Sequence, residues 1–300
     1  MKNINWAGVF PAVTTQYNED YSINIPATQN MLDALIKDGV DGIIALGTVG
    51  ENYSLSAQEK RNVLAASKEV IDGRVPLLTG VAENTTALAV NYARDSEKIG
   101  VDGLMVLPGL IYKSNQRENI NHFQQVVRNT GLPVMIYNNP ISYGVDITVE
   151  MMKTLATEEN IVAIKESSTS TFRITDIINE FGQDRFRIFC GVDNIAFESL
   201  LLGAHGWISG LTNVFPKESV AIFNLIKSGH INKALEIYRW ITPLLHLDTI
   251  PTLVQCIKLA EQLVGRGHER IRAPRMILKG KERENVVNLV EQALANRPQL

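Results

Sequence analysis

Short apolar segments alternate with longer amphipathic segments along most of the chain. Eight of the apolar segments have the length and composition of buried strands: residues 9–14, 42–46, 75–81, 103–107, 133–137, 161–165, 187–191 and 206–209. The segments between them are long enough for crossover helices: residues 28–38, 56–71, 85–99, 116–129, 148–156, 171–181 and 195–202. Alternating strands and helices imply a parallel sheet, and eight such units close into a barrel. We therefore predict an α/β protein with a (β/α)8 TIM barrel.

The end of the chain is helical by pattern. After a helix that begins near Pro216, three more helical segments follow: residues 231–245, 251–264 and 282–295. No low-complexity linker precedes them, so we expect residues 229–300 to form a C-terminal helical extension packed directly on a barrel of residues 1–228. An open doubly wound sheet is the main alternative fold. It is less favoured because no Gly-x-Gly-x-x-Gly motif follows an early strand.

A weak repeat marks the joins between helices and strands. Residues 38–44, 99–105 and 202–208 each place one glycine after a helical segment and a second glycine before a strand. The first glycine suits the left-handed position that ends a helix, and the second would let the chain turn into the strand. We interpret the repeat as structural.

Composition and charge exclude several classes of function. The 300 residues carry a net charge of −3, so the chain lacks the excess of positive charge that is typical of nucleic-acid-binding proteins. No apolar stretch approaches the roughly 18 residues that span a membrane, and residues 1–6 lack the apolar core of a signal peptide, so we expect a cytoplasmic protein. Cys190 and Cys256 are far apart and lack metal-ligand spacing, so neither a disulfide framework nor a metal site is expected.

Lys165 ends the apolar run of residues 161–164 and so lies at the tip of a buried strand. Charged side chains are normally excluded from such strands unless they are paired or take part in chemistry. Burial disfavours the ammonium form, and a neutral amine can attack a carbonyl group to form a Schiff base. The alternative is that Lys165 pairs with Glu166 and reaches solvent.

Other polar residues follow neighbouring strands. In a barrel of this type the active site lies at the carboxyl ends of the strands, which selects residues 47–52, 137–140, 165–167, 191–193 and 209–210. The loop at Thr48 can present backbone N–H groups and a hydroxyl to a carboxylate, or it is simply a tight turn. Tyr137 is either a packed aromatic residue or, beside Lys165, a phenol that carries a proton during imine formation.

Three motifs resemble the signatures of one superfamily. Gly-Thr-Val-Gly-Glu at residues 47–51, Tyr-Asn-Asn-Pro at residues 137–140 and Ile-Lys-Glu-Ser at residues 164–167 are similar to motifs of the dihydrodipicolinate synthase/N-acetylneuraminate lyase superfamily. The resemblance implies a class I Schiff-base barrel, usually a homotetramer, that acts on 2-oxo acids without metal or organic cofactor. It also implies that Lys165 is the Schiff-base lysine, Tyr137 the acid/base phenol and Thr48 a hydroxyl of the proton relay or carboxylate site.

The chain departs from the synthases of this superfamily at three places. Val49 stands where they have a second threonine, so one hydroxyl for the substrate carboxylate is missing. Ser142 stands where they have an arginine that binds the second substrate's carboxylate. A serine hydroxyl cannot form the two parallel hydrogen bonds that a guanidinium group makes with a carboxylate. In the segment that follows the fourth strand, residues 107–113, Tyr112 is the only tyrosine. It does not clearly align with the paired tyrosines of the synthases, one of which reaches across a subunit interface.

A finer resemblance concerns residues 138–146, 251–258 and 270–275, which are similar to the branch of 1-pyrroline-4-hydroxy-2-carboxylate deaminases. It implies that Lys165 attacks a cyclic imine, with dehydration, ring opening and release of ammonia to 2,5-dioxopentanoate. Asn139, Ser142 and Tyr143 are then contacts for the 4-hydroxyl group, or they brace their loop. The residues that we predict to bind substrate are Val49, Asn139, Ser142, Ile208 and Ser209.

Three functions are therefore open. The preferred prediction is the deaminase. The first alternative is a 4-hydroxy-tetrahydrodipicolinate synthase or another pyruvate-dependent aldolase, and the absence of an arginine at Ser142 argues against the synthase. The second alternative is a protein that binds a 2-oxo acid without turnover.

Overall fold

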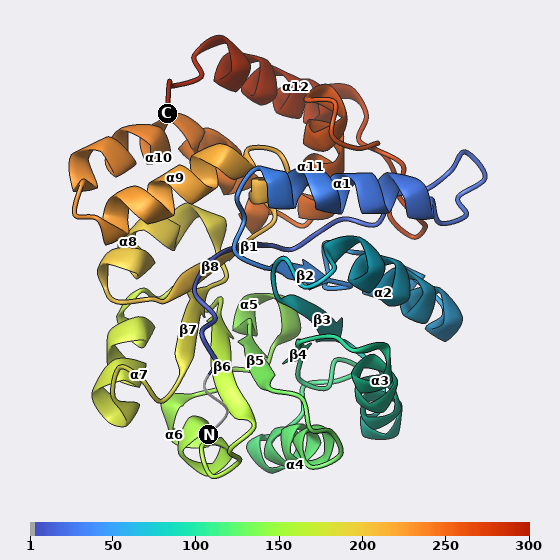
Figure 1. Ribbon diagram of the computed structural model, residues 1–300, viewed down its shortest axis with the longest axis vertical. Coiled ribbons are helices and arrows are strands. Elements are labelled where there is room, and N and C mark those ends of the chain that lie inside the picture. Colours follow the sequence, from blue (N-terminus) through green and yellow to red (C-terminus); the bar gives the residue numbers. More distant parts are fainter. Residues whose placement is uncertain (1–3) are drawn as a thin grey trace.

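Eight parallel strands occupy the middle of the molecule, as the computed structural model of residues 4–300 shows (Figure 1). They are β1 (Gly8–Pro11), β2 (Ile43–Ala45), β3 (Leu77–Val81), β4 (Gly103–Val106), β5 (Val134–Asn138), β6 (Ile161–Glu166), β7 (Arg187–Cys190) and β8 (Gly206–Ser209). Each overlaps one of the eight apolar segments, so the predicted strands are confirmed. Residues 1–3, which belong to the segment predicted to lack a signal peptide, lie outside the described residues.

The strands pair in the order β1, β8, β7, β6, β5, β4, β3, β2, and every pair is parallel. The two ends of this order meet at a parallel bridge between Ala12 and Ile44, where the Val13 N–H donates to the Ile44 carbonyl over 3.0 Å. The sheet thereby closes into the predicted (β/α)8 TIM barrel, and the doubly wound alternative is wrong. Closure brings the carboxyl ends of all eight strands to one rim.

The glycines of the repeat have two separate roles. Gly100 ends a helix in the left-handed conformation, with φ of 89°, and its N–H donates to the Ser96 carbonyl, as predicted. The second glycine serves packing more than turning. A Cβ at Gly206 would lie 2.3 Å from the Phe189 ring and 2.4 Å from the Gly8 carbonyl oxygen. The inside of the barrel is filled at this level by aromatic rings, which leave no room for a side chain there.

Helices cover the outside of the barrel (Figure 1). Those that follow the strands are α1 (Ile25–Lys37), α2 (Ala57–Ile71), α3 (Thr86–Ile99), α4 (Gln116–Val127), α5 (Pro140–Tyr143), α6 (Val149–Leu155), α7 (Phe172–Phe181), α8 (Ala196–Leu201) and α9 (Pro216–Lys227). All but α5 overlap segments predicted to be helical. Some of them begin with a side-chain cap: at α2, the Ser56 hydroxyl accepts from the Glu59 N–H while the Glu59 carboxylate accepts from the Ser56 N–H.

Single turns of 3-10 helix lie close to the carboxyl ends of three strands. They are η1 (Asn52–Ser54), η2 (Asp193–Ile195) and η3 (Leu211–Asn213). Together with α5, these turns were not predicted. They shape the loops that follow β2, β7, β8 and β5, which are the loops that carry the predicted site.

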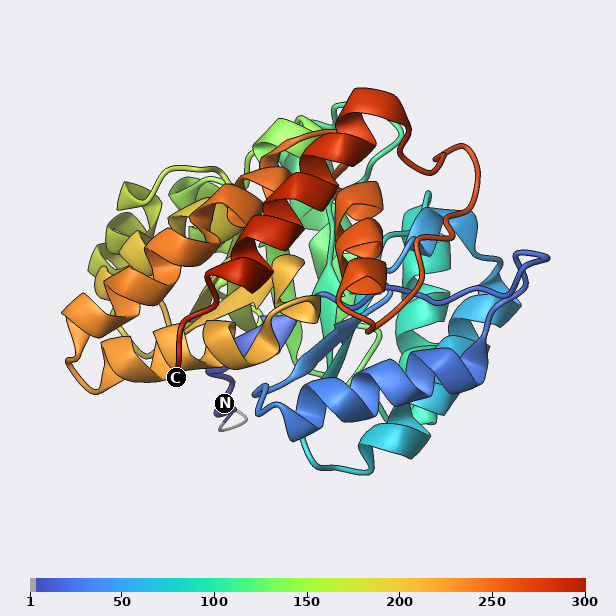
Figure 2. The same cartoon turned by 90° about the horizontal axis from the view of Figure 1, so that it is seen from above.

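The C-terminal segment consists of α10 (Ile231–Leu245), η4 (His246–Thr249), α11 (Leu253–Leu263) and α12 (Gly280–Ala295). Figure 2 shows α12 lying across α10 and α11, where the Trp240 indole N–H donates to the Ala293 carbonyl over 3.0 Å. The segment packs directly on the barrel, because α11 contacts η3 at the rim. The division of the chain after residue 228 stays a prediction. None of the helices within residues 4–300 combines the length and the apolar character needed to cross a membrane.

Candidate active site

A cavity of about 440 Å³ opens at the rim formed by the carboxyl ends of the strands. Its wall comes from the tips of β2, β5, β6, β7 and β8, from η4, and from the loop between α11 and α12. The structure brings the following predicted site residues together in this wall: Thr48, Val49, Tyr137, Asn139, Ser142, Lys165 and Ile208. Ser209 does not line the cavity, since its hydroxyl is buried and accepts from the Thr212 N–H over 3.0 Å.

Lys165 is 7% exposed and points into the barrel from the tip of β6. Its ammonium nitrogen lies 4.1 Å from the centre of the Tyr137 ring, on the neighbouring strand. Glu166 faces away and accepts from the Asn138 amide over 2.9 Å and from the Ser168 N–H over 2.6 Å. The alternative pairing of Lys165 with Glu166 is therefore absent, and within residues 4–300 Lys165 forms no ion pair.

Burial lowers the pKa of Lys165, and the nearby carboxylates of Asp248 and Asp193 oppose this effect. The net shift favours the neutral amine, which is the nucleophilic form. Space for the lysine depends on Gly191 at the end of β7, since a Cβ there would lie 2.5 Å from Lys165 Cε and 2.1 Å from the Ser167 hydroxyl. The glycine that follows β7 thus lets the lysine side chain pass through the top of the barrel.

Tyr143 links Thr48 to Tyr137. The hydroxyl groups of Thr48 and Tyr143 are 2.7 Å apart, and the Tyr137 and Tyr143 rings meet edge to face with centroids 5.5 Å apart. Burial raises the pKa of both phenols, and each phenol shifts the pKa of the other. Both therefore stay protonated near neutral pH and can donate a proton. The three hydroxyl-bearing side chains form a connected group beside Lys165.

The sequence analysis did not assign Tyr143 to this group. The available signal was local: Asn139 followed by Pro140 is a helix start, and the turn of α5 that follows brings residue 143 back over the cavity. The side-chain amide oxygen of Asn139 caps this turn by accepting from the Ser142 N–H over 3.0 Å, while the side-chain NH2 group donates to the Tyr137 hydroxyl over 3.2 Å. Asn139 therefore braces the loop and also orients Tyr137.

A buried ion pair anchors the loop after β2 to α11. The Glu51 N–H donates to the Thr48 carbonyl over 3.1 Å, and the Glu51 carboxylate lies 2.7 Å from the Lys258 ammonium in α11. Within residues 4–300, the N–H groups of Thr48 and Val49 donate to no partner. Two adjacent free N–H groups at a cavity wall suit an anion such as a carboxylate.

Two carboxyl groups act on the lysine, from the buried Asp193 and from the partly buried Asp248, which lines the cavity. The Asp193 N–H donates to the Asp248 carboxylate over 3.1 Å, and the Asp193 carboxylate accepts from the Trp207 indole N–H over 2.9 Å. Burial raises the pKa of both carboxyl groups, and the charge of Asp248 raises that of Asp193 further. The sequence analysis missed Asp248, because it lies in η4 of the C-terminal segment, where no motif marks it.

Metal-binding geometry is absent from the part of the chain that the structure describes, where no cluster of three or more His, Cys, Asp and Glu side chains is placed to hold an ion. Cys190 and Cys256 are buried and unpaired. The chemistry that the described residues support is that of an amine in a small cavity, with phenols as proton carriers.

Comparison with known proteins agrees with this geometry. The sequence pattern described as the dihydrodipicolinate synthetase family matches residues 5–293. A 4-hydroxy-tetrahydrodipicolinate synthase from Methanothrix thermoacetophila is 30% identical over 267 residues, covering 89% of this chain and 90% of the relative. YagE of Escherichia coli, named as a candidate 2-dehydro-3-deoxy-D-gluconate aldolase, is 32% identical over 265 residues, covering 87% of this chain and 88% of the relative.

Solved structures give the same result. The 4-hydroxy-tetrahydrodipicolinate synthase of Methylacidiphilum fumariolicum SolV superposes with a TM-score of 0.93 at 28% identity, covering 97% of this chain and 96% of that one. The crystal structure of YagE in complex with pyruvate superposes with a TM-score of 0.91 at 30% identity, covering 96% and 99%. Members of this family form a covalent Schiff base on a lysine and use no external cofactor. The chain therefore belongs to the dihydrodipicolinate synthetase family of Schiff-base lyases.

Proposed function

We propose that this enzyme forms and breaks a carbon–carbon bond between pyruvate and an aldehyde, with Lys165 as the covalent nucleophile. The observation that carries the proposal is the Lys165 amine, buried, without an ion-pair partner within residues 4–300, and 4.1 Å from the Tyr137 ring. The amine adds to the 2-oxo carbon of pyruvate, and loss of the carbonyl oxygen as water leaves an iminium ion. The iminium acidifies the methyl group, which becomes the carbon nucleophile.

Proton transfer is assigned to Tyr137, Tyr143 and Thr48. Loss of water from the carbinolamine needs a proton on the departing oxygen, and the Tyr137 phenol belongs to the ring whose centre lies 4.1 Å from the Lys165 nitrogen. The 2.7 Å contact between the Tyr143 and Thr48 hydroxyls lets the proton be replaced through Tyr143. In the synthases that the sequence resembles, one phenol reaches across a subunit interface, whereas here the phenol that contacts Thr48 is Tyr143 of the same chain.

The substrate carboxylate is assigned to the loop after β2. The free N–H groups of Thr48 and Val49 supply two donors, and this takes the place of the hydroxyl missing at Val49. The Val49 side chain then contributes an apolar wall beside them, opposite Ile208. Two backbone donors on the carboxylate leave Lys165 free to approach the 2-oxo carbon.

The choice of an aldolase over a deaminase rests on the relatives. Those reported above carry the names of a synthase and an aldolase, and one was solved with pyruvate bound. Among these two activities, Ser142 disfavours the synthase, because it offers a hydroxyl where the synthases use an arginine. The deaminase stays a prediction from the sequence, and Asn139 and Tyr143 are already occupied with Tyr137 and Thr48.

Borohydride trapping tests the covalent step. We expect borohydride with pyruvate to add mass irreversibly to the peptide that contains Lys165, and Lys165→Ala to remove the adduct. Lys258→Ala would remove the cation of a buried ion pair, so Lys37→Ala serves as the control, because Lys37 is exposed and pairs with Asp33. An adduct that persists in Lys165→Ala would contradict the mechanism.

A substrate panel tests the reaction class. The enzyme is incubated with pyruvate and glyceraldehyde, with pyruvate and aspartate semialdehyde, and with 1-pyrroline-4-hydroxy-2-carboxylate, and products are followed by mass spectrometry and ammonia release. We expect condensation of pyruvate with an aldehyde to exceed ammonia release. Dominant ammonia release would establish the deaminase instead, and dominant condensation with aspartate semialdehyde would establish the synthase.

We also propose that the enzyme assembles as a homotetramer. Ile111, Tyr112 and Ile141 follow β4 and β5 at the active-site rim and are between 61% and 69% exposed. Large apolar side chains on one rim are typical of a subunit interface. Light scattering after size-exclusion chromatography should give four times the mass of the chain, and a monomer mass at assay concentration would contradict the proposal.

A further inference from the structure

Within residues 4–300, the Arg275 guanidinium in the loop between α11 and α12 has no ion-pair partner. In the same loop, Arg272 pairs with Glu59 at 2.7 Å and Arg270 approaches Glu19 at 3.4 Å. Across residues 4–300, no hydrogen bond or ion pair engages the Arg275 guanidinium, although the residue is half-buried. A guanidinium group that is partly removed from water and unpaired is costly unless an anion meets it.

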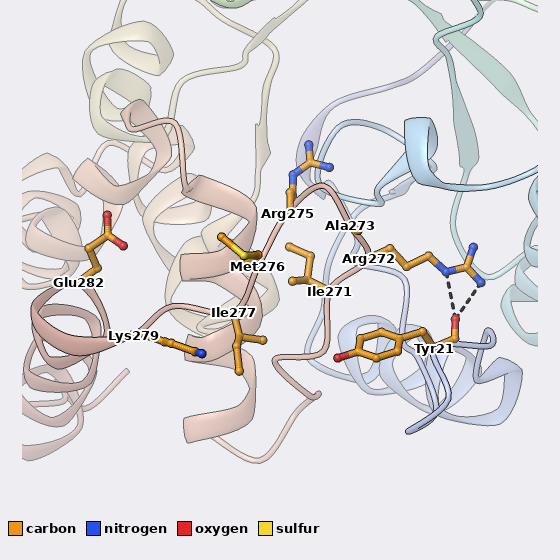
Figure 3. Close-up of a pocket in the computed structure, with 9 residues that line it drawn as sticks. All are labelled: Tyr21, Ile271, Arg272, Ala273, Arg275, Met276, Ile277, Lys279 and Glu282. Atoms are coloured by element: carbon orange, nitrogen blue, oxygen red, sulfur yellow. Dashed lines mark hydrogen bonds between the residues drawn. The ribbon is translucent and has the colours of Figure 1, made fainter.

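Arg275 lies between two cavities. Arg275 lines the Lys165 cavity and also one edge of a larger groove of about 760 Å³ on the C-terminal segment. Figure 3 shows the Arg275 guanidinium pointing away from Tyr21, Met276 and Lys279, which line the groove. The side chain therefore faces the active-site cavity.

Arg275 shares the cavity wall with Tyr143. Burial raises the pKa of Tyr143 and the Arg275 charge opposes that rise, so the guanidinium acts on the phenol that contacts Thr48. The same positive charge acts on Tyr53, which follows the loop after β2. Arg275, Thr48 and Tyr143 all line the same cavity.

The substrate geometry then decides what Arg275 meets. On the proposed function, Lys165 holds carbon 2 and the Thr48 and Val49 N–H groups hold carboxylate 1, so the rest of the substrate extends toward the mouth of the cavity. Ser142 lines that region with only a hydroxyl. Arg275 adds a planar guanidinium group to this region, and such a group can donate two parallel hydrogen bonds to a carboxylate.

We propose that Arg275 binds a carboxylate at the distal end of the substrate, so that the enzyme prefers 2-oxo acids that carry a second carboxylate. This inference rests on the proposed function and deepens it. It places in the C-terminal loop the positive charge that the chain lacks at Ser142. It also names a specificity-determining residue outside all three motifs.

The test compares ligands that differ only in the distal group. Isothermal titration calorimetry measures the binding of 2-oxoglutarate against 2-oxopentanoate, and of 2-oxoadipate against 2-oxohexanoate, to the full-length enzyme. Because a hydrogen-bonded charge pair contributes about 1.5–3 kcal/mol, we expect the dicarboxylate of at least one pair to bind about tenfold tighter or more. Arg275→Met should abolish the preference and Arg275→Lys should keep part of it.

Lys279→Met is the matched control, because Lys279 lies in the same loop, is exposed and lines only the outer groove. It removes one positive charge and should leave the preference intact. Equal binding of both members of each pair by wild type would overturn the inference. So would a preference that survives Arg275→Met, or one that Lys279→Met abolishes equally.

Borohydride trapping of pyruvate on the wild-type enzyme separates this inference from the proposed function. A Lys165 adduct without a dicarboxylate preference would refute the role of Arg275 alone. A preference that depends on Arg275 without any adduct would support Arg275 as an anion site and refute the Schiff-base proposal.

Discussion

Lys258 and Glu51 form an ion pair with no exposure to water, and its disruption tests how the C-terminal segment supports the site. The Lys258 ammonium lies 2.7 Å from the Glu51 carboxylate, donates to the Thr15 carbonyl over 2.8 Å and lies 4.4 Å from the centre of the Tyr17 ring. Burial lowers the pKa of Lys258, and Glu51 opposes this. We predict that Lys258→Met destabilises the fold severely, because the Glu51 carboxylate would remain buried without its cation.

The expected magnitude follows from the burial of both groups. Removing one partner of a buried pair costs about 3–5 kcal/mol, because the other charge stays desolvated. The unfolding entropy of a chain of 300 residues is about 0.6 kcal/mol per kelvin, so the melting temperature should fall by about 5–8 °C. The double substitution Lys258→Met with Glu51→Gln should recover part of this loss, because it removes the unpaired charge while an amide still accepts from the Arg272 N–H.

Differential scanning calorimetry measures these shifts. Lys37→Met is the matched control, since the Lys37 side chain is 71% exposed and its pair with Asp33 should contribute at most about 1 kcal/mol. A fall of less than about 2 °C in Lys258→Met, or an equal fall in Lys37→Met, would refute the reasoning. A double variant less stable than Lys258→Met would show that packing, and not the stranded charge, dominates.

Three further predictions concern the site itself. Tyr137→Phe should lower kcat by roughly 10²-fold with an unchanged circular dichroism spectrum, and an unchanged rate would make Tyr137 a packing residue. Thr48→Val should slow the reaction and Thr48→Ser should largely restore it, because serine keeps the hydroxyl that contacts Tyr143; equal rates for both variants would exclude a relay. Since burial holds the Lys165 pKa below its ordinary value of 10.5, the rate of pyruvate trapping should rise with pH and level off below pH 10.5. The Asp248 carboxylate favours the ammonium form, so Asp248→Asn should move that rise to lower pH, and a shift to higher pH would contradict the assignment.

The strands and most helices could be predicted because their signals are local. A strand buried on both faces reads as an apolar run, and a crossover helix as an amphipathic one, whatever the rest of the chain does. Lys165 could be selected for the same reason, since a lysine at the end of such a run is informative by itself. The turn α5 was missed because four residues are too few to show a period.

Ser209 shows where local reasoning stops. It lies at the predicted strand tip, yet its hydroxyl turns away from the cavity to cap the turn η3. Successive strand residues point to opposite faces of the sheet. An error of one residue in the assumed register therefore assigns to the cavity wall a side chain that is in fact packed away from it. Ile208, its neighbour, is the residue that lines the cavity.

The sequence by itself determined the alternation of strands and helices, and it marked Lys165, Tyr137 and Thr48 through motifs that lie next to those strands. Only the tertiary structure decided that Tyr143 connects Thr48 to Tyr137, that Asp248 lies near the lysine, and that Arg275 faces the cavity. The physical reason is distance along the chain. Apolar periodicity records which side of an element is buried, but the placement of a loop from the C-terminal segment depends on how whole elements pack, and no local pattern encodes that contact.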